Sequence, residues 1–139
     1  MSRTFLWPQG YTSAAMISVN LDAEFYGRIF YPGIDVSEGD IQRLGWTGME
    51  YGLPHLLDCF REHGVKGTFF IPGRVAELYP DAVRAIADAG HELGCHGYEH
   101  EILAHFTPEE QLELLKKAKA AIEKAAGRAV TGFRMPEGE

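Results

Sequence analysis

The chain has 139 residues, 45% hydrophobic and 24% charged, which is enough for one compact domain with its own core and too little for two of ordinary size. Its 13 Lys and Arg residues against 20 Asp and Glu give a formal net charge of -7, which argues against a nucleic-acid-binding surface and against an anionic membrane as the main partner. Because the N-terminal residues hold no apolar run of signal-peptide length and no stretch approaches a membrane span, we expect a cytoplasmic protein.

Apolar runs alternate with amphipathic segments in the first half of the chain. Residues 14–21 form a near-continuous apolar run, the pattern of a strand buried on both faces. A long loop, rich in glycine and aromatic residues, is expected over 23–49. The helical spacing of apolar residues then predicts a helix over 51–63, and residues 67–73 predict a second strand that ends in a Pro-Gly turn.

The same alternation continues in the second half. Apolar residues at helical spacing predict a helix over 75–89, and residues 91–96 follow where a third strand belongs. Thr107, followed by a proline and two glutamates, is typical of a helix start, and this helix is expected to run to Gly127, before a fourth strand over 129–133. Repeated strand-helix alternation predicts parallel strands joined by right-handed helical crossovers, so the fold class is α/β.

Polar side chains gather where three of these strands end. Ligands of parallel α/β folds bind at the carboxyl ends of the strands. Here those ends carry residues 20–24, 96–100 and 134–138, which together contain carboxylates, imidazoles and a guanidinium. We therefore expect the functional site at this rim.

Two histidines and one aspartate at the rim form a candidate metal site. His96 and His100 are four residues apart, so on one helical turn their rings would lie on the same face and could bind one cation. Asp22, from another strand, would complete a ligand set of two nitrogens and one oxygen and would leave positions open for water and substrate. A metal ion bound in this way lowers the pKa of its bound water towards about 7. Two other interpretations stay open: ordinary polar loop residues, and an iron oxygenase site.

Residues 91–100, His-Glu-Leu-Gly-Cys-His-Gly-Tyr-Glu-His, closely resemble the second motif of the polysaccharide deacetylases (the NodB-homology domain, carbohydrate esterase family 4). In that motif a strand leads into a metal-binding His-x-x-x-His. Residues 20–24 lie where the family has its first motif, 132–138 resemble the third, and 67–73 resemble the second strand. The resemblance extends from about residue 16 to 138 and is closest to the branch that holds peptidoglycan deacetylases and the cyclic-imide and allantoin hydrolases.

The resemblance implies a distorted (β/α) barrel, of which this chain would be the N-terminal half. It implies a divalent metal held by Asp22, His96 and His100, with zinc expected and cobalt, nickel or manganese as alternatives. It also implies hydrolysis of a non-peptide carbon-nitrogen bond, usually the removal of an acetyl group from an amino sugar. Arg134 takes the position that tethers the catalytic carboxylate of the first motif.

One departure from the family concerns the general base, an Asp at the position of Asn20. An amide has no basicity near neutral pH, and general-base help is worth about 10²–10⁴-fold. Glu24 and Glu137 are candidate replacements at the same rim, and the family's general-acid histidine would lie beyond Glu139. Three functions stay open: N-deacetylation of a peptidoglycan- or chitin-like polysaccharide, ring opening of a small cyclic amide or imide (allantoinase-like), and carbohydrate binding by a catalytically weakened homologue.

Aromatic residues of the long loop are candidates for substrate binding. Phe25, Tyr26 and Trp46 suit stacking on a sugar face or a flat heterocycle, although packing on the barrel wall or on a neighbouring subunit is an equal alternative. Pro136, in the turn after the third motif, would line the groove. One domain over 1–139, stopping after the fourth strand, would leave its first and last strands with unpaired edges, so we expect either a homo-oligomer or a truncated product.

Overall fold

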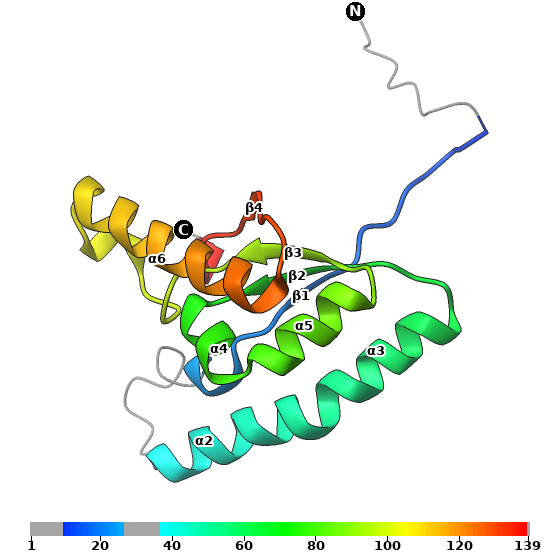
Figure 1. Cartoon of the computed structure of the whole chain (residues 1–139), viewed down its shortest axis with the longest axis horizontal. Coiled ribbons are helices and arrows are strands. Elements are labelled where there is room, and N and C mark those ends of the chain that lie inside the picture. Colours follow the sequence, from blue (N-terminus) through cyan, green and yellow to red (C-terminus); the bar gives the residue numbers. More distant parts are fainter. Residues whose placement is uncertain (1–9, 27–36, 139) are drawn as a thin grey trace, which may run out of the picture.

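The computed structural model describes residues 10–26 and 37–138, and its described strands form one parallel sheet. The strands are β1 (Ser18–Asn20), β2 (Thr68–Ile71), β3 (Glu92–Cys95) and β4 (Gly132–Phe133), in the order β1-β2-β3-β4 (Figure 1). All three neighbouring pairs are parallel, so the predicted α/β class is confirmed. In the described part of the chain the sheet is an open portion of a barrel, with β1 and β4 at its edges.

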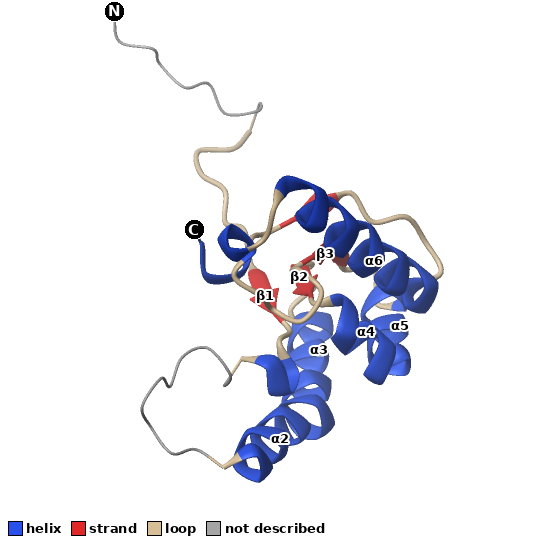
Figure 2. Ribbon diagram, turned by 90° about the vertical axis from the view of Figure 1, so that its left-hand side faces the viewer, coloured by secondary structure: helices blue, strands red, loops and turns tan. Residues whose placement is uncertain are grey.

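Helices connect the strands. The helices α2 (Glu38–Thr47) and α3 (Leu53–Glu62), joined by a π-helical turn (Gly48–Gly52), lie between β1 and β2 in the sequence. The helices α4 (Gly73–Leu78) and α5 (Pro80–Asp88) lead to β3, and α6 (Pro108–Ala126) leads to β4. Figure 2 shows α4, α5 and α6 on the same side of the strands. None of the described helices is both long and apolar enough to cross a membrane.

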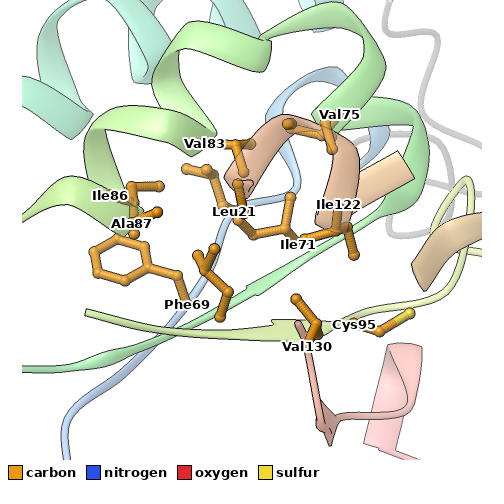
Figure 3. Packing of buried hydrophobic residues seen from close by; sticks show 14 of the residues in the cluster. Leu21, Phe69, Ile71, Val75, Val83, Ile86, Ala87, Cys95, Ile122 and Val130 are labelled. Carbon is orange, nitrogen blue, oxygen red and sulfur yellow. The ribbon is translucent and has the colours of Figure 1, made fainter. Parts of the chain in front are cut away.

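The hydrophobic core lies between these helices and one face of the sheet. Along β2, Phe69 and Ile71 are fully buried, whereas Thr68 and Phe70 point to the opposite face and are half-buried. Strand β3 continues both faces in register, and the helices supply the covering side chains, which include Val75, Val83, Ile86 and Ile122 (Figure 3). The face opposite the core carries Thr68 and Phe70 of β2.

The expected loop over 23–49 is wrong for its second half. Residues 38–52 are helical, and Ser37 caps the start of α2 by accepting a hydrogen bond from the backbone nitrogen of Asp40. Of the glycines that suggested a loop, Gly45 is required by packing, because a Cβ there would clash with the backbone nitrogen of Glu24. Residues 27–36 of the expected loop lie outside the described residues.

Three further elements differ markedly from the prediction, and one is the fourth strand, expected over 129–133 and reduced to Gly132–Phe133. The strand expected over 14–21 is reduced to Ser18–Asn20 and is only partly buried, because β1 pairs with β2 alone among the described strands. The helix expected over 75–89 is two helices that meet at Tyr79, whose backbone (φ -126°, ψ 54°) is not helical. The cause is Pro80, since a proline disfavours the helical conformation of the residue before it.

The predicted start of the long helix at Thr107 is confirmed. The Thr107 hydroxyl accepts from the backbone nitrogen of Glu110, whose carboxylate accepts in turn from the backbone nitrogen of Thr107, which forms a capping box. The helix ends at Gly127, which adopts the left-handed conformation (φ 69°). Both ends of α6 are thus encoded locally.

Candidate metal centre

Three side chains from two strand ends converge on one point. Asp22 follows β1, whereas His96 and His100 follow β3, and one ligand atom from each lies within 4.8 Å of the other two. The His96 Nε2 atom is 3.6 Å from Asp22 Oδ1, and the His100 Nε2 atom is 3.8 Å from Asp22 Oδ2. Asp22, His96 and His100 are 7%, 1% and 2% exposed, so the cluster is almost fully shielded from solvent.

The two histidines lie on a loop, so the expectation of a helical turn is wrong. Gly97 has φ 72° and His100 has φ 59°, both in the left-handed region, and the ring centroids are 4.9 Å apart with an interplanar angle of 74°. The carboxylate of Glu101 holds this loop by accepting hydrogen bonds from the backbone nitrogens of Tyr98 (2.9 Å) and Glu99 (2.6 Å). Sequence reasoning missed Glu101, because a single glutamate after the motif carries no distinct signal.

The donor atoms fit a divalent cation. The His96 Nδ1 atom donates to the backbone oxygen of Arg134 at 2.8 Å, so its Nε2 atom carries the lone pair and faces Asp22. Among the described residues, His96 Nε2 and Asp22 Oδ1 are buried without a hydrogen-bond partner, and such orphaned atoms call for an explanation. Two imidazole nitrogens and one carboxylate are a set that zinc and neighbouring transition metals accept.

The electrostatics of the cluster also favour a bound cation. Burial, and secondarily the charge of Glu137, raise the pKa of Asp22 from 3.8 to about 6. Burial lowers the pKa of both His96 and His100, so at neutral pH the imidazoles are neutral and able to act as ligands. The carboxylate is therefore unfavourable without a positive partner, and a cation would relieve that cost.

Arg134 links the first and third motifs beside this cluster. Its Nη1 atom donates to Asn20 Oδ1 and its Nη2 atom to Ser18 Oγ, both at 2.8 Å. The guanidinium lies 4.0 Å above the ring of Phe70, on the face of the sheet opposite the core. The ring has room there because position 94 is glycine, where a Cβ would lie 2.6 Å from it. Arg134 thus makes hydrogen bonds to two residues of β1, one of which is Asn20.

The two candidate replacement bases lie in different surroundings. Glu137 belongs to a short 3-10 helix (Pro136–Gly138), and its Oε1 atom is 3.6 Å from His100 Nδ1. Glu24 belongs to another short 3-10 helix (Ala23–Phe25), and its carboxylate accepts from the hydroxyl of Tyr79 at 3.2 Å. Of the two, the structure brings Glu137 to the histidines.

The four candidate substrate-binding residues differ in their solvent exposure. Tyr26 is half exposed and lines, together with Asn20 and Asp22, a cavity of about 450 Å³ between β1 and α2. Trp46 is also half exposed, on α2, and meets the ring of Tyr51 edge-on at 5.7 Å. Phe25 and Pro136 are buried, and their side chains therefore contribute to packing rather than to an open groove.

Together, a parallel α/β sheet with an Asp-His-His cluster at the carboxyl ends of its strands defines a candidate metallohydrolase. Residues 45–139 match the family model of the polysaccharide deacetylases, and the chain belongs to that family. The predicted family is thereby confirmed, and the matched segment contains the second and third motifs, whereas residues 20–24 precede it.

Several relatives show how much of such proteins the chain represents. It is 38% identical to the peptidoglycan deacetylase of Helicobacter pylori over 106 residues, which cover 76% of this chain and 36% of that protein. The chain spans about a third of the length of that protein and of a peptidoglycan-N-acetylglucosamine deacetylase of Bacillus cereus, and 18% of a relative from Listeria monocytogenes. In structure it is similar to a protein of Mycobacterium smegmatis assigned to the polysaccharide deacetylases, with a TM-score of 0.83 and 34% identity over 95% of this chain and 46% of that one.

A third relative differs in activity. The chain is similar to a CE4 family pseudoenzyme from Bacillus anthracis, with a TM-score of 0.63 and 35% identity over 66% of this chain and 32% of that one. A mutant of that pseudoenzyme has restored enzymatic activity. Membership of the family therefore does not by itself decide whether a chain is active.

Proposed function

We propose that this chain carries the metal-binding part of a hydrolase that removes N-acetyl groups from an amino-sugar polymer of the peptidoglycan or chitin kind. The observation that carries the proposal is the buried Asp22-His96-His100 cluster, whose ligand atoms lie within 4.8 Å of one another at the rim of the sheet. Support for the substrate class comes from the family and from relatives that are peptidoglycan deacetylases.

Each residue of the site has a distinct task in this proposal. A divalent ion, with zinc favoured, would be held by Asp22, His96 and His100 and would act as a Lewis acid on the acetyl carbonyl and on water. Arg134 fixes the Asn20 amide by donating to its oxygen, which leaves the amide NH₂ as a donor beside the cavity. Asn20 thus orients a reacting group, but it cannot accept its proton.

A second candidate function is carbohydrate binding by a catalytically weakened homologue. It is favoured by Asn20 at the base position, and a CE4 pseudoenzyme among the structural relatives shows that such proteins exist in the family. The substitution Asn20→Asp separates the two, because the guanidinium of Arg134 already lies at 2.8 Å from the position of the new carboxylate.

The experiment measures acetate released from acetylated chito-oligosaccharides by the zinc-loaded chain, with His96→Ala as the metal-site control. Release by the natural chain that His96→Ala abolishes supports the deacetylase proposal. Release by Asn20→Asp alone, with a gain of about 10²–10⁴-fold, supports the weakened homologue. Ring opening of hydantoin or allantoin without acetate release would contradict both interpretations and indicate a cyclic-amide hydrolase. If no variant reacts in any assay, the proposal that the chain belongs to an enzyme is contradicted.

We also propose that the open sheet edges are covered by a second copy of the chain. Among the described strands, β1 pairs only with β2 and β4 only with β3, and Ile17 and Phe133 are more than 40% exposed beside these edges. Light scattering should then show a dimer or larger assembly, and a well-folded monomer would contradict this.

A further inference from the structure

Backbone strain is concentrated around the candidate metal centre. Of the described residues other than glycine, three have a positive φ: Ala23 (47°), His100 (59°) and Glu137 (63°). Ala23 follows the ligand Asp22, His100 is itself a candidate ligand, and Glu137 lies against His100. Such conformations persist where the surrounding structure enforces them and they cluster at functional sites, so the position of Glu137 calls for a functional account.

The imidazole of His100 lies between two carboxylates. Its Nε2 atom faces Asp22 Oδ2 at 3.8 Å, and its Nδ1 atom faces Glu137 Oε1 at 3.6 Å. In the part of the chain that the structure describes, both His100 Nδ1 and Glu137 Oε1 are buried and make no hydrogen bond. The two atoms lie slightly beyond hydrogen-bond range, and a hydrogen bond between them would satisfy both at once.

The other histidine of the cluster already has the acceptor that His100 needs. The His96 Nδ1 atom donates to the backbone oxygen of Arg134, which leaves Nε2 as the ligand atom. For His100 to present Nε2 in the same way, its Nδ1 atom must carry the proton and needs an acceptor. Glu137 lies three residues after Arg134, so one short segment can fix the tautomer of both imidazoles.

We propose that Glu137 is the positioning residue of His100. Its carboxylate accepts a hydrogen bond from the protonated Nδ1 atom and thereby directs the Nε2 lone pair at the metal ion. This inference rests on the metal site of the proposed function and assigns to Glu137 a role other than general base. It also gives a reason for the strained backbone at both His100 and Glu137, since each must turn towards the other.

The test compares the zinc affinity of the natural chain with that of Glu137→Ala, Glu137→Gln and the control Glu99→Ala, by calorimetric titration. Loss of an outer-shell acceptor typically lowers metal affinity by about 10–100-fold, and we expect that loss for Glu137→Ala. Glu137→Gln should retain most of the zinc affinity, because its amide oxygen can still accept a hydrogen bond from the Nδ1 atom of His100. Glu99→Ala removes an exposed carboxylate from the residue beside His100 and should bind zinc as the natural chain does.

A spectroscopic measurement supports the titration and does not depend on the folding of a variant. Imidazole ¹⁵N NMR of the zinc-loaded natural chain should show His100 protonated at Nδ1. Equal affinity of Glu137→Ala and the natural chain, or a metal-bound Nδ1 on His100, would overturn the inference. It would also be overturned if Glu137→Gln bound zinc as weakly as Glu137→Ala and changed the visible spectrum of the cobalt-loaded chain, because Glu137 would then be a ligand itself. Absence of zinc binding by the natural chain would instead refute the proposed function.

Discussion

Replacing Asp22 by asparagine should stabilise the metal-free chain and abolish its stabilisation by zinc. The carboxyl group is 7% exposed, and burial together with Glu137 raises its pKa from 3.8 to about 6. When the pKa of a group is higher in the folded state than in the unfolded state, its protonation stabilises the folded state. This stabilisation is complete below the unfolded-state pKa and is lost as the pH rises through the folded-state pKa. At neutral pH, therefore, the ionised Asp22 opposes folding unless a cation accompanies it.

The size of the effect follows from this pKa difference. Each pKa unit corresponds to about 1.36 kcal/mol, so the ionised carboxylate costs the folded, metal-free chain on the order of 3 kcal/mol near pH 7.5. The amide that replaces the carboxyl group would itself be buried without full hydrogen bonding, which offsets part of the gain, and we expect Asp22→Asn to add about 1–2 kcal/mol to the free energy of unfolding. That difference should shrink as the pH falls from about 6 towards 4, because Asp22 then takes up its proton.

The assay is denaturant unfolding of both chains with a chelator and with excess zinc. With zinc at about 100 times its dissociation constant, the natural chain should gain about 2.7 kcal/mol and Asp22→Asn nothing, so that their order of stability reverses. Asp88→Asn, an exposed carboxylate at the end of α5, is the matched control and should change stability by less than about 0.5 kcal/mol in both conditions. The reasoning is refuted if Asp22→Asn is less stable than the natural chain under chelation, or if zinc stabilises both equally.

Three further substitutions test the parts that support the site. Arg134→Ala removes two hydrogen bonds, one of them to Asn20, and should cost about 1–3 kcal/mol of unfolding free energy; an unchanged denaturant midpoint would contradict the tether. Gly94→Ala places a Cβ 2.6 Å from the ring of Phe70 and should cost about 1–3 kcal/mol by the same measurement, whereas a neutral effect would mean that the ring moves freely. Thr107→Ala breaks the capping box of α6 and should lower stability by about 1 kcal/mol, measured by thermal unfolding with circular dichroism; no change would show that the cap is redundant.

The parts of the fold that sequence could predict are those encoded by local pattern. The parallel sheet follows from alternating apolar runs and helices, and α6 from Thr107 and Gly127 at its two ends. The convergence of Asp22 with the two histidines was predictable because the carboxyl ends of parallel strands share one rim.

Other features depend on contacts that no local pattern contains. Spacing by four residues is compatible with both a helical turn and a loop. The loop that carries His96 and His100 is held by the hydrogen bonds that Glu101 accepts, and these cannot be read from the spacing. The glycines of α2 indicated a loop, although Gly45 is required by the approach of the Glu24 backbone. The burial of Phe25 likewise depends on tertiary packing, because an aromatic side chain near a site suits either a groove or a core.

The metal content of the purified chain tests the central claim most directly. After exposure to zinc and removal of the unbound metal, elemental analysis should find about one zinc ion per chain, and His96→Ala and His100→Ala should lose it while remaining folded. A natural chain that retains no divalent ion, or variants that retain as much as the natural chain, would contradict the assignment of Asp22, His96 and His100 as a metal centre.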